Sequence, residues 1–271
     1  MRLIQQLTKE SSPMRKSLIA LGLLAATAAV PAQAEYLYGF GSMYADYQVW
    51  DQGIGNDDDN FGGDIGDRNQ AVIGIEGGAG FDWGQIYGFY DYEGVDRSGD
   101  DRGASTKGTI HYNLTDSGVS LYAQVYNTDT DAGFHEQNRV LGLGYTGLNG
   151  DGWGVTSFVG VHQLNTTGNS GSNGGMAGWV GYYNTDIGGQ NFTFSTWGEF
   201  EFARNDDYSD AQSTDFASGV GSESWGLNGS VNALWNFHEN WSTGVLYRYT
   251  VNKLARKDYQ DLIIYRLQYN F

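Results

Sequence analysis

The side chains with the clearest catalytic potential are four histidines, because hydrolases use histidine as a base beside a serine, threonine or cysteine nucleophile. They are His111, His135, His162 and His238. None lies in a nucleophile motif such as G-x-S-x-G, and the chain has no cysteine. We therefore expect no enzyme and no cofactor. A hydrolase whose base and nucleophile meet only in the folded chain remains an alternative.

Acidic residues between Asp51 and Asp67 raise the question of a calcium site. An EF-hand loop starting at Asp57 fails, because its fifth position is Phe61 and its twelfth is Arg68 rather than glutamate. A solvated surface loop without a bound metal is therefore the favoured interpretation. A second acidic segment contains Asp206, Asp207, Asp210 and Asp215. Together the two segments predict a negative rim that attracts divalent cations diffusely or disfavours anionic solutes.

Two patterns typical of nucleotide or nucleic-acid binding do not hold. Residues 142–147 match G-x-G-x-x-G, but a glycine-rich turn and another strand candidate follow in place of the helix that a dinucleotide site needs. The formal net charge is −17, which is the wrong sign for a nucleic-acid surface.

The elements that position these side chains are strands, as the C-terminal segment 261–271 illustrates. Every second residue counted back from the C-terminus is apolar or aromatic: Phe271, Tyr269, Leu267, Tyr265 and Ile263. Alternate positions Arg266, Gln268 and Asn270 are polar, and Leu262 and Ile264 close the pattern. Side chains alternate between the two faces of a strand, so one face of this segment is apolar and the other is polar. The length suits a tilted strand that crosses a bilayer, roughly 9–11 residues.

The same periodicity predicts twelve strands whose connections alternate in length. The strands are expected at 36–50, 70–79, 85–92, 104–114, 119–127, 139–146, 153–163, 176–184, 191–202, 224–235, 241–251 and 260–271. Short connections are expected at 80–84, 115–118, 147–152, 185–190 and 236–240, and long ones at 51–69, 93–103, 128–138, 164–175, 203–223 and 252–259. This layout predicts an all-β fold, a closed antiparallel transmembrane β-barrel of the outer-membrane type with about 12 strands.

Aromatic residues near strand ends are typical of the two interfacial girdles of such barrels. Trp225 and Trp235 stand at the two ends of one apolar face. The expected girdle residues are Trp225, Trp235, Trp241, Tyr265, Tyr269 and Phe271.

The first 34 residues are predicted to be a secretory signal peptide. Arg15 and Lys16 precede an apolar run, and the small residues of 31–34 form an A-x-A cleavage site. Residues 1–13 precede an internal Met14 and are a possible misassigned start. Residues 35–271 then form a single barrel domain. This domain contains no proline, as suits a large closed sheet, because proline cannot donate to a ladder.

The segment Glu76–Asp91 resembles the second and third strands of the nucleoside-specific channel-forming family (Tsx and OmpK), and is closer to the OmpK-like branch. Further similarity lies at 136–139, 176–179, 247–249 and 265–271, dispersed over most of the chain. The resemblance implies a monomeric twelve-stranded outer-membrane barrel, passive nucleoside uptake and, in some members, service as a phage receptor. The nucleoside-contacting residues of the family do not match this chain one by one.

Strand parity places a set of polar side chains on the face opposite the apolar one, toward a lumen. They are Glu76, Lys107, His111, Tyr122, Gln124, Glu199, Glu201, Arg248 and Arg266. Charges of both signs either neutralise one another and hold the barrel shut, or line a path for hydroxylated solutes. Both interpretations stay open. We expect a narrow channel for small neutral solutes, most simply nucleosides. A surface receptor or structural barrel, and a general small-solute porin, are the alternatives.

The expected partners follow from this location. They are the lipid bilayer, outer-leaflet lipopolysaccharide, nucleosides or similar neutral solutes, and the outer-membrane assembly machinery that would engage the C-terminal strand. A phage is a possible further partner, and nucleic acid is not.

Overall fold

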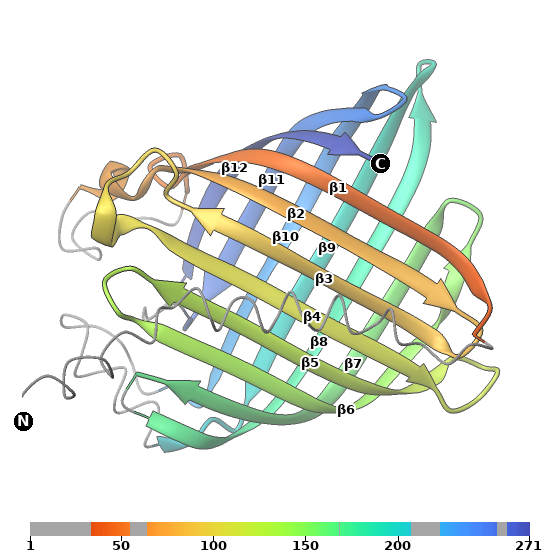
Figure 1. Cartoon of the computed structure of the whole chain (residues 1–271), viewed down its shortest axis with the longest axis horizontal. Helices are drawn as coiled ribbons and strands as arrows, with labels where there is room; N and C mark the ends of the chain where they lie inside the picture. Colours follow the sequence, from red (N-terminus) through yellow and green to blue (C-terminus); the bar gives the residue numbers. More distant parts are fainter. Residues whose placement is uncertain (1–33, 55–63, 168, 207–222, 254–258) are drawn as a thin grey trace, which may run out of the picture.

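The chain forms a closed barrel of antiparallel strands (Figure 1), described by a computed structural model over residues 34–54, 64–167, 169–206, 223–253 and 259–271. The strands are β1 (Tyr36–Val49), β2 (Gln70–Phe81), β3 (Gly84–Glu93), β4 (Gly103–Asn113), β5 (Val119–Thr130), β6 (His135–Gly150), β7 (Trp153–Thr166), β8 (Asn169–Ile187), β9 (Gln190–Phe202), β10 (Trp225–His238), β11 (Trp241–Val251) and β12 (Tyr259–Asn270). The predicted twelve-stranded architecture is confirmed.

Each strand pairs with its neighbours in sequence, and the first strand pairs with the last. The seam between β1 and β12 runs from Ser42 opposite Asn270 to Val49 opposite Ile263. Every strand therefore has two partners, so no sheet edge is left open. This is the condition under which strands satisfy their backbone groups in a hydrocarbon environment.

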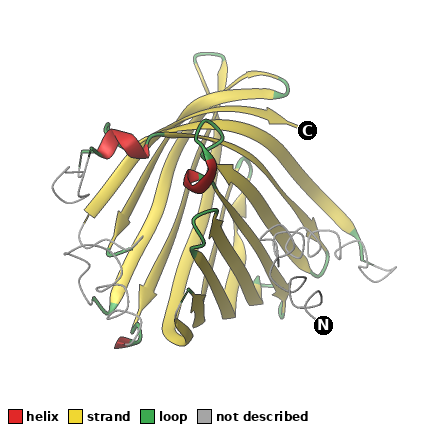
Figure 2. Cartoon of the chain, turned by 60° about the vertical axis from the view of Figure 1, so that its left-hand side comes forward, coloured by secondary structure: helices red, strands yellow, loops and turns green. Residues whose placement is uncertain are grey.

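Over the residues that the structure describes, helix is confined to the connections. Two short 3-10 helices, η2 (Ile65–Arg68) and η3 (Gly99–Asp101), lie between β1 and β2 and between β3 and β4 (Figure 2). Among the described residues, no helix is both long and apolar enough to cross a membrane.

The barrel wall is apolar outside and polar inside, the reverse of a soluble domain. On β12, Leu267 and Phe271 on the outer face are 47% and 64% exposed, whereas Gln260 and Gln268 on the inner face are buried. Met43, Leu141, Val161 and Val231 are exposed on the outer faces of other strands. A surface of this kind is stable against lipid rather than water.

The six aromatic residues expected in the girdles all have exposed side chains. Trp235, Trp241, Tyr269 and Phe271 lie near the short-turn end, and Trp225 begins β10 at the opposite end. Tyr265 lies in the middle of β12, and its hydroxyl donates to Gln52 Oε1 at 2.8 Å. Contact of these rings with the membrane interface stays a prediction.

Two of the predicted long connections are wrong. The segments 128–138 and 164–175 are mostly strand, so β5 joins β6 through residues 131–134, and β7 joins β8 through 167–168. The ladder continues through polar pairs such as Gln137 opposite Asn165. Apolar alternation marks only the part of a strand that faces lipid, so it does not reveal an extension beyond. Gly133, with φ of 93°, supplies the left-handed residue of the tight 131–134 turn.

The connection between β1 and β2 is not wholly a solvated surface loop, which corrects the expectation for 51–67. Ile65 and Trp50, at its two ends, are buried in a cluster with Leu246, Leu262 and Ile264 from the inner faces of β11 and β12. These residues form an apolar contact inside one part of the barrel. Asp57, within the proposed calcium loop, and the predicted signal segment 1–33 lie outside the described residues.

Candidate functional site in the barrel interior

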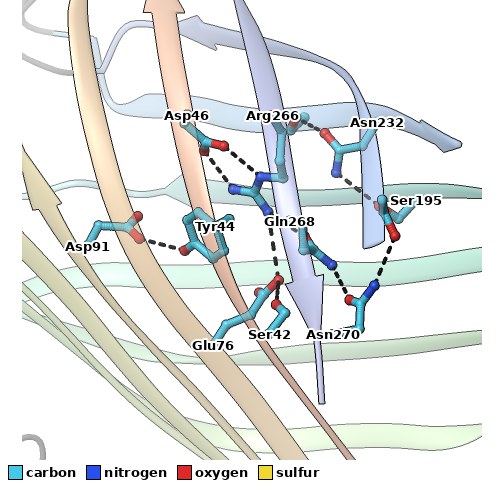
Figure 3. Close-up of polar contacts among 12 residues, drawn as sticks. Ser42, Tyr44, Asp46, Glu76, Asp91, Ser195, Asn232, Arg266, Gln268 and Asn270 are labelled. Carbon is cyan, nitrogen blue, oxygen red and sulfur yellow. Dashed lines mark hydrogen bonds and ion pairs between the residues drawn. The ribbon is translucent and has the colours of Figure 1, made fainter. Parts of the chain in front are cut away.

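Inward-facing polar side chains form three groups along the strands. The first, which we call the seam cluster, consists of Tyr44, Asp46, Glu76, Asp91 and Arg266 (Figure 3). Arg266 donates to both carboxylate oxygens of Asp46, at 2.8 and 2.7 Å, across the β1–β12 seam. The two residues stand directly opposite each other in the ladder. Such a bidentate pair fixes the register as well as contributing energy.

The seam cluster continues onto β2 and β3. The Arg266 guanidinium lies 3.7 Å from the centre of the Tyr44 ring, and its Nη1 is 3.7 Å from Glu76 Oε1. The Tyr44 hydroxyl donates to Asp91 Oδ1 at 2.5 Å. Ser42 and Tyr87 donate to the two oxygens of Glu76, at 3.3 and 2.7 Å. The seam cluster therefore links β12, β1, β2 and β3 along one wall of the barrel.

The second group, the crossing cluster, consists of Lys107, Gln124 and Glu199. Lys107 Nζ on β4 lies 2.6 Å from Glu199 Oε1 on β9. Gln124 Nε2 on β5 donates to the same oxygen at 2.9 Å. In the barrel order β5, β6, β7 and β8 separate β4 from β9, so this ion pair reaches across the interior.

Aromatic rings surround the crossing cluster. Lys107 Nζ lies 5.7 Å from the centres of both the Tyr126 and the Trp197 rings. The Arg248 guanidinium is 5.8 Å from the same Trp197 ring. Tyr122, which donates to Gln124, stacks on Phe158 with ring centres 4.1 Å apart. Flat ring faces beside polar groups are the surfaces on which a heterocyclic base stacks.

The third group lies at the end of the barrel that carries the remaining long connections. Glu201 accepts from Arg204 Nε at 2.7 Å and also pairs with Lys253. Arg204 Nη1 donates to the backbone carbonyl of Asn252 at 2.7 Å. These contacts tie β9 to the connection that follows β11. They hold one carboxylate between two cations.

The structure thus separates the predicted lumen residues into distinct sets. Lys107, Tyr122, Gln124 and Glu199 are brought together, because the Tyr122 hydroxyl donates to Gln124 Oε1. Glu76 and Arg266 meet in the seam cluster, and Glu201 belongs to the third group. His111 packs against Ser120 and the Tyr122 ring. Roles in solute passage stay predictions for all of them.

Several interior residues were missed at the sequence level. Tyr44 and Asp46 have the same parity on β1 as the buried Ser42, and Trp197 has the same parity on β9 as Glu199. Extending the parity rule to these strands would have found them. Asp91 lies on β3 and was not among the residues expected in the lumen. Its contact with Tyr44 places it inside.

The histidines do not assemble a catalytic group among the described residues. His111 Nδ1 lies 2.9 Å from Ser120 Oγ, but Ser120 is fully buried. His135 contacts Asp129 at 2.7 Å, so serine and aspartate serve different histidines. In the same part of the chain, no group of three or more histidine and acidic residues is placed to hold a metal ion.

Comparison with solved structures finds outer-membrane barrels. The chain is similar to the NanC porin, at 9% identity, with 85% of this chain and 98% of that chain covered and a TM-score of 0.46. It is also similar to the KdgM porin in complex with disordered oligogalacturonate, at 10% identity, 85% and 99% coverage and a TM-score of 0.43. The outer-membrane channel DcaP of Acinetobacter baumannii gives 11% identity, 89% and 99% coverage and a TM-score of 0.38.

The family comparison covers most of the chain. The model described as "Nucleoside-specific channel-forming protein, Tsx" matches residues 43–271, from β1 to the C-terminal residue. The match takes in β1 from Met43 onward, all of β2–β12 and all three interior groups. The expectation drawn from the resemblance of 76–91 is confirmed: this chain belongs to the nucleoside-specific channel-forming family.

Proposed function

We propose that the protein is an outer-membrane channel through which nucleosides and similar small neutral solutes diffuse passively. The observation that carries this proposal is the interior of a sealed barrel in which acidic and basic side chains form ion pairs with aromatic faces beside them. Membership of the channel-forming family supports the same function. The seam cluster and the crossing cluster each combine acidic and basic groups. A neutral solute passes such a surface without leaving a charge unpaired.

The interior offers two kinds of contact to a nucleoside. Rings such as Trp197, Tyr126 and Phe158 offer faces for the base, with about 1–3 kcal/mol for each stacked base. Polar side chains such as Gln124 and Glu199 offer hydrogen bonds to the sugar hydroxyls. Contacts along the path must be weak and repeated, because a tightly held solute does not leave.

We assign the solute path to the inward-facing polar residues of the mid-strand region. These are Glu76, Lys107, His111, Tyr122, Gln124, Glu199, Glu201, Arg248 and Arg266. Their place inside the barrel supports this assignment. Within this set, Glu76 and Arg266 line the wall of the path beside the seam, whereas Lys107 and Glu199 meet across the interior.

Liposome swelling tests the proposed function. Purified protein is reconstituted and challenged with iso-osmotic adenosine, uridine, and a neutral sugar of equal size. Faster swelling with the nucleosides supports the proposal. Equal rates would make the protein a general pore. Swelling no faster than protein-free liposomes would favour a receptor or structural barrel, a role for which the apolar cluster around Ile65 and Leu262 offers an internal obstruction.

The proposal includes a location and partners. An outward apolar wall fits the lipid bilayer, and the polar extensions of β5 to β8 fit the lipopolysaccharide headgroups of the outer leaflet. We propose that the N-terminal 34 residues direct export. The C-terminal strand, ending in Phe271, is the segment that the assembly machinery would engage. A phage would meet the long connections. Catalysis is not part of the proposed function.

A further inference from the structure

The crossing ion pair differs from the other ion pairs in how far apart its strands lie. Lys107 and Glu199 belong to β4 and β9, which are separated by β5–β8 on one side and by β10–β12 and β1–β3 on the other. Arg266 pairs with Asp46 on an adjacent strand and with Glu76 one strand further. The Lys107 side chain therefore reaches Glu199 across the lumen rather than along the wall.

The bridge is well buried and supported from both sides. The Lys107 and Glu199 side chains are 14% and 11% exposed. Gln124 shares the Glu199 oxygen, and Tyr122 in turn donates to Gln124. Met176 on β8 is buried beside Gln124, with its sulfur 4.0 Å from Nε2. Side chains from β4, β5, β8 and β9 therefore meet at one level of the interior.

Two cations face the Trp197 ring, and one of them is paired with a carboxylate. The ring faces Lys107 at 5.7 Å and Arg248 at 5.8 Å. Lys107 has Glu199 as its partner, whereas no ion pair joins Arg248 to a carboxylate in the described chain. Arg248 Nε is also buried without a hydrogen-bond acceptor there. Glu199 therefore neutralises one of the two cations that face the Trp197 ring.

We propose that the Lys107–Glu199 pair is the constriction of the channel and sets its charge selectivity. This inference rests on the proposed channel function. A neutral solute with hydroxyl groups exchanges hydrogen bonds with Gln124 and Glu199 while the two charges stay paired. An anionic solute competes with Glu199 for Lys107, and a cationic solute competes with Lys107 for Glu199. Either competition leaves one charge of the pair without its partner, which is costly in a confined site.

Planar-bilayer recording under a potassium chloride gradient tests the proposal. Glu199→Gln leaves Lys107 and Arg248 beside the Trp197 ring with no carboxylate paired to either. We therefore expect the ratio of chloride to potassium permeability to rise by about fivefold, which corresponds to about 1 kcal/mol for one unit charge. Lys107→Met removes the opposite charge and is expected to lower the ratio by a similar factor. Both variants are expected to raise single-channel conductance, because the bridge is broken.

The matched control is Asp46→Asn, which removes one carboxylate of equal charge from an ion pair between neighbouring strands. It is expected to change the permeability ratio by less than about twofold, because Asp46 lies in the wall. The charge-reversed double variant, Lys107→Glu with Glu199→Lys, restores the pair and is expected to restore the wild-type ratio. Resistance of the folded barrel to heating in detergent is measured for each variant to establish that it has folded.

The outcomes are separable from those of the proposed function. Opposite shifts in the two single variants, with recovery in the double variant, support the constriction even for a pore without nucleoside preference. Unchanged ratios in folded Glu199→Gln and Lys107→Met, or a shift in Asp46→Asn as large as theirs, would overturn it. Nucleoside-selective swelling together with unchanged ratios would keep the channel function and refute the constriction alone.

Discussion

The seam cluster and the crossing cluster contain the same chemistry in two different positions. Each joins a basic side chain to a carboxylate within 2.8 Å, and each is largely shielded from water. Arg266 and Asp46 stand opposite each other on paired strands, so their contact reinforces the ladder that closes the barrel. Lys107 and Glu199 have no ladder between them. Their contact occupies space through which a solute would move.

The position of an ion pair in the barrel decides whether its loss changes stability alone or ion selectivity as well. Losing one partner of a buried pair leaves an uncompensated charge, which destabilises a protein by about 3–5 kcal/mol. At the seam, loss of a partner lowers mainly the stability of the folded barrel. Inside the lumen the remaining charge also meets permeating ions. Mutations in the two clusters should therefore separate stability from selectivity.

Replacing Arg266 with methionine is expected to give the largest effect on stability. The substitution leaves Asp46 and Glu76 without their shared cation at the closing seam, so we expect a loss of about 3–5 kcal/mol in the free energy of unfolding. Urea unfolding of the barrel in lipid vesicles measures this loss. The double variant with Asp46→Asn should recover part of it, since fewer uncompensated charges remain. A loss below about 1 kcal/mol in the single variant would show that the seam does not depend on this pair.

Replacing Trp197 with leucine is expected to weaken solute binding rather than folding. The ring faces both Lys107 and Arg248 and offers a stacking surface, worth about 1–3 kcal/mol for each base. We expect the concentration of adenosine that half-blocks the single-channel current to rise by about tenfold. The matched control is Trp179→Leu, because the Trp179 ring packs over Gly198 on the outer face of the neighbouring strand. Equal effects of the two substitutions would remove Trp197 from the path.

Replacing Ser42 with alanine is expected to give the smallest effect. Its hydroxyl donates to Glu76 at 3.3 Å, while Tyr87 donates to the other oxygen of Glu76 at 2.7 Å. In this variant Glu76 keeps its hydrogen bond from Tyr87 and its ion pair with Arg266. We therefore expect a loss of about 0.5–1.5 kcal/mol in the free energy of unfolding and an unchanged permeability ratio. Thermal unfolding and bilayer recording of the same sample measure both quantities. A change in the permeability ratio would show that the Ser42 hydroxyl also acts on the permeating ions.

Much of the wall was predictable from the order of side chains. Period-two alternation placed Arg266, Gln268 and Asn270 on one face of the last strand and Tyr269 and Phe271 on the other, and both assignments match the burial in the barrel. Alternation does not mark the parts of the strands where lipid no longer imposes it. The extensions of β5–β8 carry polar residues such as Gln137 and Asn165 on faces that apolar periodicity does not mark.

Parity predicts that a side chain faces inward, but it does not predict what the side chain meets. Lys107 and Glu199 were each assigned to the interior, yet their contact depends on how far β4 and β9 lie apart once twelve strands have closed. Asp46 and Arg266 meet for a different reason, because closure makes the first and last strands neighbours. Neither relation is local in the chain.

The sequence by itself determined the number of strands, the two faces of those with clear alternation, and the membership of a channel-forming family, because alternation along a strand is a local property of neighbouring residues. The tertiary structure alone decided which interior charges pair along the wall and which pair across the lumen. That choice depends on strand order, register and closure, which bring together residues far apart in the chain.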